Sequence, residues 1–344
     1  MSHRQPAPVH HAPDGGATGP PWPGDRGGHL WAKDREVVTD DGARIRYVLL
    51  GDDDATHDAP PVVLCAGFMC PDNFWVHLGP SLARRHRVVV LNYRGVGAST
   101  DPRPPGYRGI NLRAEDYTIP RIAGDVAAVL DAEGLSGALA LGHSMGVEVA
   151  LQLWRDRPDL VAALSLVAGP YRSPLHTFYG SDLGNALFPV VRYGLPLVPR
   201  PVQWQARKAL LLPVTIPVAR AIRALGPHTP EEHMRRYREH FARVDPMVAL
   251  RTAQGMHEFD AGGWLGQIDV PTQIVVGTHD AWCPPSVGEA LRDAIPDARL
   301  LVLEGASHAA PIEFPARIVH HLDQLLVDRF GLPPLTARRQ RPPQ

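Results

Sequence analysis

A serine between two glycines is the first residue in this sequence that could carry out covalent chemistry. The segment 142–146, Gly-His-Ser-Met-Gly, fits the pattern G-x-S-x-G and follows the apolar run 138–141. Apolar residues recur after it at helical spacing, so the segment predicts a strand, a sharp turn and a helix. Such a turn holds the serine hydroxyl clear of the sheet, and the glycines let the turn close. We therefore predict that Ser144 is a nucleophile.

A serine nucleophile needs a base and a carboxylate that orients the base. In open α/β sheets, such groups lie beyond the carboxyl ends of strands. Asp280 follows the predicted strand 272–276, and His308 follows the predicted strand 299–303. The chain order serine, aspartate, histidine is typical of a nucleophile on a G-x-S-x-G turn. We predict Asp280 as the orienting acid and His308 as the base.

Attack on a carbonyl group creates an oxyanion, which two fixed amide donors can stabilise. The amide of Met145, directly after the nucleophile, is one candidate. The second candidate is the amide of Phe68, in the loop 66–70 that follows the predicted strand 61–65. Gly67 would permit the close turn that this loop needs. We therefore predict an oxyanion hole formed by the backbone N–H groups of Phe68 and Met145.

Three further residues near these segments are weaker candidates for chemistry. We expect His143 to point the wrong way along the turn and to be structural. His279 could support the acid loop from a second layer, and Asp182 is a distant rival for the acid.

The three cysteines, Cys65, Cys70 and Cys283, all lie near predicted strand ends. A cysteine nucleophile would compete with Ser144 for the histidine base. The sequence also lacks C-x-x-C pairs and H-x-x-x-H pairs with a third ligand, so a zinc site is disfavoured. We predict no metal and no cofactor. An odd number of cysteines without framework spacing favours a reducing compartment, and we expect a cytoplasmic protein.

The elements that must position these residues alternate along the chain. Two β-rich runs, 35–39 and 44–50, flank an Asp-Asp-Gly turn and predict a hairpin. Strands and helices that alternate in this way predict a mostly parallel sheet with helices on both faces. The buried strands are expected at 61–65, 88–91, 138–141, 163–168, 272–276 and 299–303, and helices at 72–85, 118–133, after Ser144 and at 315–327.

The alternation breaks between 171 and 255, where no buried strand is predicted. Helix candidates occur there at 183–195, 203–212, 218–225 and 231–241. We interpret 171–255 as a helical cap over the carboxyl ends of the strands, inserted into a core of 31–170 and 256–332. The run 209–219 (ALLLPVTIPVA) could suggest a lipid-interface enzyme, but its two prolines and its length favour a buried cap element.

Both ends of the chain are poor in large apolar residues. Residues 1–30 are rich in Pro, Gly and His, and we predict that they are disordered because they cannot bury enough surface. His3, His10 and His11 in this tail lack partners at metal-site spacing. Residues 333–344 are basic and Pro-rich and are predicted to be loose.

The bulk composition excludes several classes of function. The 344 residues are 44% hydrophobic and 21% charged, with a net charge of −1. This charge gives no general electrostatic case for binding nucleic acid or an anionic membrane. No apolar run reaches the roughly 18 residues that span a bilayer. We expect a small-molecule substrate, and a homodimer remains open.

These motifs together resemble the α/β-hydrolase fold family over about 33–330. The segment GHSMG resembles its nucleophile elbow, and 277–280 and 305–308 resemble its acid and base loops. The segment NYRGVGAS at 92–99 resembles the family's D-x-R-G-x-G-x-S segment. The resemblance implies a mostly parallel eight-stranded sheet, a Ser-His-Asp triad without a cofactor, and a substrate between cap and core.

Two positions depart from the family's pattern. The family's usual His-Gly in the oxyanion loop is Ala66-Gly67 here, and its usual aspartate before the arginine is Asn92. Neither change removes an amide donor, but both leave the subfamily undetermined.

Three functions remain compatible with these residues. The first is hydrolysis of a small, fairly apolar ester, thioester or lactone through an acyl-enzyme on Ser144. The second is cleavage of a carbon–carbon bond in a diketone by the same triad. The third is a ligand-binding protein on the same fold without catalysis, because a fold by itself does not fix function.

Overall fold

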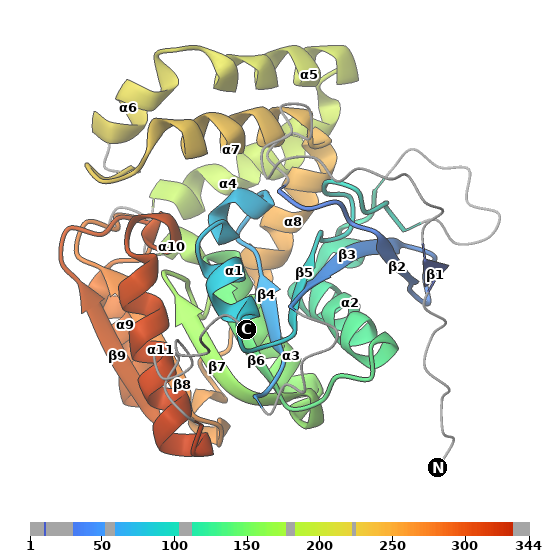
Figure 1. Ribbon diagram of the computed structural model, residues 1–344. Coiled ribbons are helices and arrows are strands. Elements are labelled where there is room, and N and C mark those ends of the chain that lie inside the picture. Colours follow the sequence, from blue (N-terminus) through green and yellow to red (C-terminus); the bar gives the residue numbers. More distant parts are fainter. Residues whose placement is uncertain are drawn as a thin grey trace, which may run out of the picture.

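One sheet runs through the whole molecule, with helices on both faces (Figure 1). The computed structural model describes residues 10–11, 30–51, 59–102, 112–176, 183–221 and 225–332. The strand order is β1-β2-β3-β5-β4-β6-β7-β8-β9; β1, β2, β3 and β5 pair antiparallel, and the pairs from β5 to β9 are parallel. The strands are β1 (His10–His11), β2 (Arg35–Val38), β3 (Arg44–Leu50), β4 (Val62–Cys65), β5 (Val88–Leu91), β6 (Ala138–His143), β7 (Val161–Val167), β8 (Thr272–Gly277) and β9 (Ala298–Leu303).

The strands β2 to β9 form the mostly parallel sheet that the sequence predicts, with the eight strands that the family resemblance implies. The two-residue β1 adds a short pairing to β2 and is a correction, since His10 and His11 were expected in a disordered tail. Leu30, the last residue of that predicted tail, is also described and is buried rather than disordered. The rest of the tail, including His3, and the predicted loose tail 333–344 lie outside the described residues.

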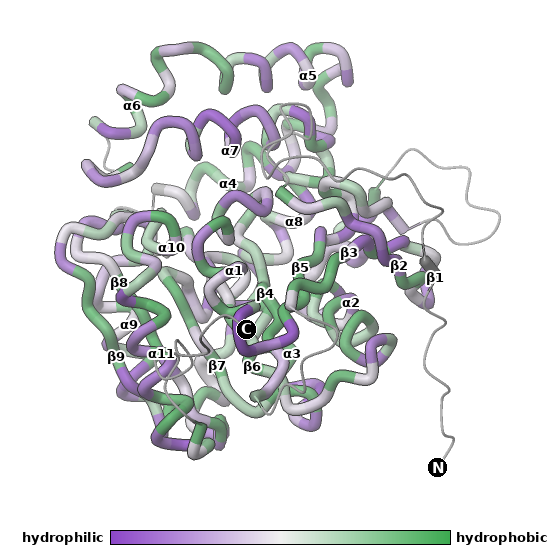
Figure 2. The backbone as a smooth tube through the Cα atoms, in the orientation of Figure 1, coloured by the Kyte–Doolittle hydropathy of each residue, from purple (hydrophilic) through white to green (hydrophobic). Residues whose placement is uncertain are grey.

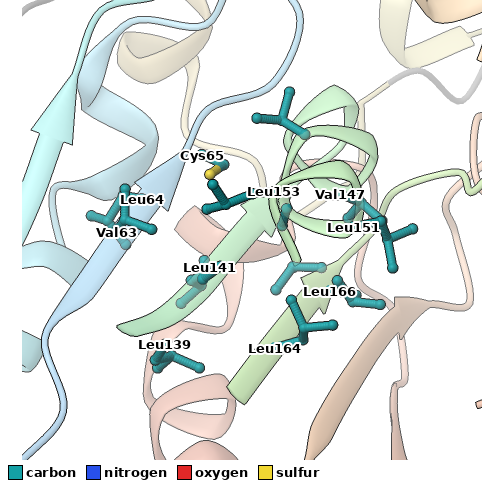
Figure 3. Close-up of a cluster of buried hydrophobic side chains, with 14 of the residues drawn as sticks. Val63, Leu64, Cys65, Leu139, Leu141, Val147, Leu151, Leu153, Leu164 and Leu166 are labelled. Carbon is teal, nitrogen blue, oxygen red and sulfur yellow. The ribbon is translucent and has the colours of Figure 1, made fainter. Parts of the chain in front are cut away.

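The central strands are buried on both faces, as their unbroken apolar sequences predict. Helices α1 (Leu78–Ala83) and α11 (Pro315–Phe330) contact each other on one face, and α2 (Ile119–Ala132) and α3 (Met145–Asp156) pack together on the other. Figure 3 shows buried side chains of β4, β6 and β7 gathered around α3. Full burial of each such Leu or Val contributes about 1.5–3 kcal/mol, so this cluster fixes the helix that follows Ser144.

A run of helices connects β7 to β8 and lies over the carboxyl ends of the strands (Figure 1). We call α4 to α7 the helical layer. Its members are α4 (Leu183–Gly194), α5 (Arg200–Lys208), α6 (Thr215–Ala221) and α7 (Glu231–Arg243). The next helices, α8 (Pro246–Glu258), α9 (Pro285–Ala294) and α10 (Ala310–Glu313), return the chain to the core. Among the described residues, no helix is both long enough and apolar enough to cross a bilayer.

Two expectations about helices need correction. The helix predicted at 72–85 is divided into a 3-10 helix, Asp72–Trp75, and α1. Pro80 explains the division, because it has no N–H to donate and so is tolerated only in the first turn of a helix.

The sequence suggested that the run 209–219 is a buried cap element, and the structure contradicts this prediction. Leu212, Val214 and Val218 are 51%, 57% and 48% exposed. The other side of this short segment faces α7 and the interior, so only half of its apolar surface is covered.

Candidate active site

Ser144 lies on a sharp turn between β6 and α3 in a strained backbone conformation. Its φ is 55° and its ψ is −124°, a region that residues other than glycine rarely adopt. The flanking glycines make the turn possible. A Cβ atom on Gly146 would lie 1.9 Å from the carbonyl oxygen of Cys65, and one on Gly142 would lie 2.2 Å from the carbonyl oxygen of Gly146. The side chain of Ser144 is therefore presented at the carboxyl end of the sheet.

The structure brings the three predicted side chains together in one hydrogen-bonded row. His308 Nε2 lies 2.8 Å from Ser144 Oγ, and His308 Nδ1 lies 2.8 Å from Asp280 Oδ2. Because the carboxylate can only accept, Nδ1 donates its proton to Asp280, which leaves Nε2 to accept the proton of the serine hydroxyl. The row joins loops that follow β6, β8 and β9.

Asp280 is held on both of its oxygens. Its Oδ1 accepts the backbone N–H groups of Trp282 at 2.8 Å and Cys283 at 2.9 Å. Its Oδ2 faces His308, and the residue is only 3% exposed. A carboxylate fixed in this way holds the imidazole in one orientation. His279 was a candidate to support the acid loop. Its backbone N–H donates to the carbonyl of Ala306, and this hydrogen bond joins the acid loop to the base loop.

Of the two amides predicted as an oxyanion hole, that of Phe68 lies in a loop beside the strained Met69, and that of Met145 directly follows the strained Ser144. Within the described part of the chain, neither the N–H of Phe68 nor that of Met145 donates to a protein acceptor. Met145 begins α3, whose positive dipole end therefore lies beside Ser144. Met69, next to Phe68, has φ 51°, and Ala168 after β7 has φ 48°. Positive φ values at the ends of β4, β6 and β7 surround the same point, which is typical of functional sites.

Two residues beside this row contact the base or its loop; His143 was expected to be structural, and Trp282 was not singled out from the sequence. The Nε2–H of His143 donates to the backbone carbonyl of His308 at 2.8 Å, and its ring stacks on Phe74. Burial and the nearby His308 lower the pKa of His143 to about 3, so the ring is neutral. The indole of Trp282 stacks on the His308 ring, with centroids 5.5 Å apart. Both residues restrict how the base can move.

Two apolar cavities meet at Ser144. The smaller one, about 210 Å³, extends toward α4 and α8 and is lined by Leu175, Phe188 and Met256, among others. The larger one, about 370 Å³, extends beneath α6 and α7 and is lined by Leu210, Ile216 and Phe241, among others. Phe68, Trp282 and His308 border both cavities. The geometry leaves apolar space on two sides of the serine oxygen.

The cysteines are poorly suited to act as nucleophiles. Cys283 is 3% exposed, and burial together with the charge of Asp280 raises the pKa of its thiol. Burial raises the pKa of Cys65 to about 12, and it also raises the pKa of Cys70. Since the thiolate is the reactive form, these thiols stay protonated near neutral pH.

Glu148 is an unexpected buried acid in the first turn of α3. It is fully buried, and neither of its oxygens has a hydrogen-bond partner among the described residues. Burial raises its pKa well above the ordinary value, which keeps the carboxyl neutral.

The segment 92–99 has a structural role. Arg94 is buried and makes two hydrogen bonds to Asp125, at 2.7 and 2.5 Å, and one to Asp41 at 2.8 Å. Asn92 accepts the N–H of Ala98 through Oδ1 at 3.1 Å, so the amide can close this loop in place of the family's aspartate.

The remaining candidates add no second centre. Asp182, the rival acid, lies outside the described residues. Within the described ranges, no three His, Cys, Asp or Glu side chains come together as a group that could hold a metal ion.

Comparison with known proteins identifies the family. The family model described as the alpha/beta hydrolase fold matches residues 60–315. The chain belongs to the α/β-hydrolase fold family. It is 26% identical over 259 residues to "Putative carbamate hydrolase RutD" of Klebsiella pneumoniae, which covers 74% of this chain and 86% of that protein. The protein of the same name from Escherichia coli O127:H6 is 27% identical over 281 residues, covering 79% and 94%.

Solved structures share the fold at lower identity. An esterase from Exiguobacterium antarcticum superposes with a TM-score of 0.63 at 20% identity, covering 83% of this chain and 97% of the esterase. The enol-lactonase of Burkholderia xenovorans LB400 gives a TM-score of 0.58 at 22% identity, covering 83% and 97%. The family match and the sequence relatives support a hydrolase of this fold, and the solved structures support the fold.

Proposed function

We propose that this protein is a serine hydrolase that cleaves small, fairly apolar esters, thioesters or lactones through an acyl-enzyme on Ser144. The observation that carries the proposal is the row Asp280–His308–Ser144, with both hydrogen bonds at 2.8 Å. In such a row the carboxylate holds the imidazole, and the imidazole activates the hydroxyl.

The proposed reaction has two halves. His308 Nε2 takes the proton of Ser144 as Oγ attacks the acyl carbon, and the amides of Phe68 and Met145 stabilise the oxyanion. His308 then gives the proton to the leaving alcohol or thiol, and the acyl group remains on Ser144. Water next loses a proton to His308 and attacks the acyl carbon; the proton returns to Ser144 and the acid is released. No cofactor enters any of these steps.

The apolar cavities support the choice of substrate. A carbonyl carbon at Ser144 would have mostly hydrocarbon side chains on two sides, which favours apolar groups on both the acyl and the leaving side. We propose the helical layer, within 171–255, as a cap domain that covers these cavities. A carbamate carbonyl, suggested by the names of the relatives, could be attacked by the same serine, but the apolar linings favour the ester. The three free cysteines support the proposal of a reducing, cytoplasmic setting.

The test combines covalent labelling with turnover. Wild-type protein should be labelled by a fluorophosphonate probe and should hydrolyse p-nitrophenyl esters of graded chain length, whereas Ser144→Ala should do neither. A panel with a p-nitrophenyl carbamate and a ring-fission diketone distinguishes ester cleavage from its alternatives. Folded wild-type protein that is neither labelled nor active would favour a ligand-binding protein instead.

A further inference from the structure

The outer surface of the helical layer is unusually apolar. Of the fourteen large apolar side chains that are exposed among the described residues, eleven lie between 187 and 218. Leu187, Val190, Val191, Tyr193 and Leu197 belong to α4 and the turn after it; the other six, Val202, Trp204, Leu211, Leu212, Val214 and Val218, belong to the segment of α5 and α6, and we call these six the outer face. Figure 1 shows α5 and α6 as the outermost row of the molecule. An apolar surface concentrated in one region marks an interaction site.

The outer row carries apolar and basic residues side by side. Figure 2 shows hydrophobic stretches in α5 and α6 separated by hydrophilic ones, above a largely hydrophilic α7. An exposed helical segment that combines apolar and basic residues is typical of segments that lie at a membrane surface.

Local rotation of the outer row would not hide its apolar residues. Leu210, Ile216 and Ala219 of the segment around α6 already line the larger cavity. Leu212, Val214 and Val218 of the same segment face outward. Because both sides of the segment are apolar, a turn about its axis would expose one set as it covered the other.

The charge of this region is positive, although the whole chain carries −1. Residues 183–221 contain five Arg or Lys and no Asp or Glu, and 183–258 contain eleven against five. Some of these cations are paired: Arg192 with Glu258 at 3.0 Å, Arg200 with Asp245 at 2.6 Å and Arg220 with Glu231 at 2.9 Å. These pairs engage three of the five cations of 183–221, and within the described residues Arg207 and Lys208 form no ion pair, so the segment keeps an excess of positive charge.

We propose that the outer face docks this protein on the surface of a bilayer that contains anionic lipids. Apolar side chains of the α5–α6 segment would enter the boundary between headgroups and acyl chains, and the neighbouring Arg and Lys would meet lipid phosphates. A second copy of the chain fits less well. A symmetric dimer through this face would place 183–221 against itself, and that segment holds cations without acids.

Docking can be measured by co-sedimentation of the full chain with lipid vesicles. Partition onto vesicles of phosphatidylcholine mixed with phosphatidylglycerol should be about tenfold stronger than onto phosphatidylcholine alone, and added salt should weaken it. The triple variant Leu212→Ser, Val214→Ser, Val218→Ser should lower this partition by about tenfold or more. All three side chains are about half exposed, so the variant should fold normally, and thermal unfolding verifies this.

Matched controls distinguish vesicle binding through the outer face from nonspecific binding by exposed apolar residues elsewhere. The double variant Val38→Ser, Val302→Ser removes apolar side chains of 39% and 38% exposure elsewhere and should bind vesicles like wild type. Ser144→Ala should also bind like wild type, so docking is tested apart from hydrolysis.

Several outcomes would overturn the proposal. One is wild-type protein that does not bind, or that binds both kinds of vesicle equally. Another is a triple variant that binds like wild type. A third is a dimer, seen by sedimentation velocity without lipid, that the triple variant breaks; the face would then be a protein interface.

Discussion

The loops at the carboxyl ends of the strands and the helices above them are fixed in different ways. In the loops, each group of the Ser144 row has a defined partner, and the backbone is strained around them. In the helical layer, the side chains near the site are mostly apolar, and much of the outer row has no protein over it. Directional hydrogen bonds can set a reaction geometry, whereas apolar packing sets size and surroundings. We therefore expect changes in the loops to alter chemistry, and changes in the layer to alter which molecules are accepted.

The largest effect on activity is expected from removal of the Ser144 hydroxyl. Ser144→Ala should reduce kcat/KM for p-nitrophenyl esters by roughly 10⁴-fold or more, because it removes the nucleophile and leaves only binding and the oxyanion donors. The free energy of unfolding should change little, since only one oxygen atom is lost. Substantial residual activity in the purified variant would show that the reaction does not pass through this serine.

The second-largest effect is expected from a substitution in the turn that carries Ser144. Gly146→Ala should lower the free energy of unfolding by more than about 3 kcal/mol, because the new Cβ would lie 1.9 Å from a backbone oxygen that cannot move aside alone. Urea unfolding measures the loss. The matched control is Gly124→Ala in α2, where nothing lies within 4 Å, and where alanine should add roughly 0.5–1 kcal/mol. Equal stability of the two variants would show that the turn can relax.

A third test compares two carboxyl groups: that of Glu148, in the helix that follows Ser144, and that of Glu232, on α7 of the helical layer. Glu148 is buried with a raised pKa, so above pH 4.5 the unfolded state releases a proton that the folded state retains. Wild-type stability should therefore fall as pH rises, by at most about 1.4 kcal/mol per pH unit. Glu148→Gln should remove this fall: the variant should match wild type below pH 4.5 and become the more stable protein above it.

The control for this pH series is Glu232→Gln on α7. Glu232 lies at the surface, where Arg236 lowers its pKa, so its substitution should leave the pH dependence of unfolding nearly unchanged. Thermal unfolding at a series of pH values tests both variants. A Glu148→Gln variant that tracks wild type throughout would mean that this carboxyl is not held neutral.

These two regions also differ in how far the sequence predicted them. The parallel sheet followed from unbroken apolar runs, and Ser144, Asp280 and His308 could be named because each follows a predicted strand or turn. Local patterns reached no further. The bond between His143 and the carbonyl of His308 joins residues 165 positions apart, and the stacking of Trp282 on His308 depends on how two loops fold back.

The helical layer shows why the remainder was not predictable. The apolar run 209–219 looks the same whether it is buried or exposed, because hydrophobicity along the chain does not say which element will cover it. Only the position of α7 beneath the run shows that Leu212 and Val214 face outward. The exposure of this segment is a tertiary property, and the sequence could supply only its composition.

The smallest predicted effect concerns the two cavities, which belong to the helical layer and its neighbours. Ile216→Phe should narrow the larger cavity and Leu175→Phe the smaller one, since each residue lines only that cavity. Two homologous series of esters are compared, one lengthened in the acyl chain and the other in the alcohol. Each variant should slow the hydrolysis of the longest members of one series by about tenfold. The shortest ester should react with both variants at nearly the wild-type rate.

The two variants are controls for each other. Each adds a side chain of similar volume to one of the two cavities and leaves the Ser144 row unchanged. The series that each substitution slows assigns the acyl and leaving groups to their cavities. Were both variants to slow the same series, the cavities would act as one space. Were either to slow the shortest ester as strongly as the longest, the layer would be altering the chemistry itself, and the division of roles between loops and helices would fail.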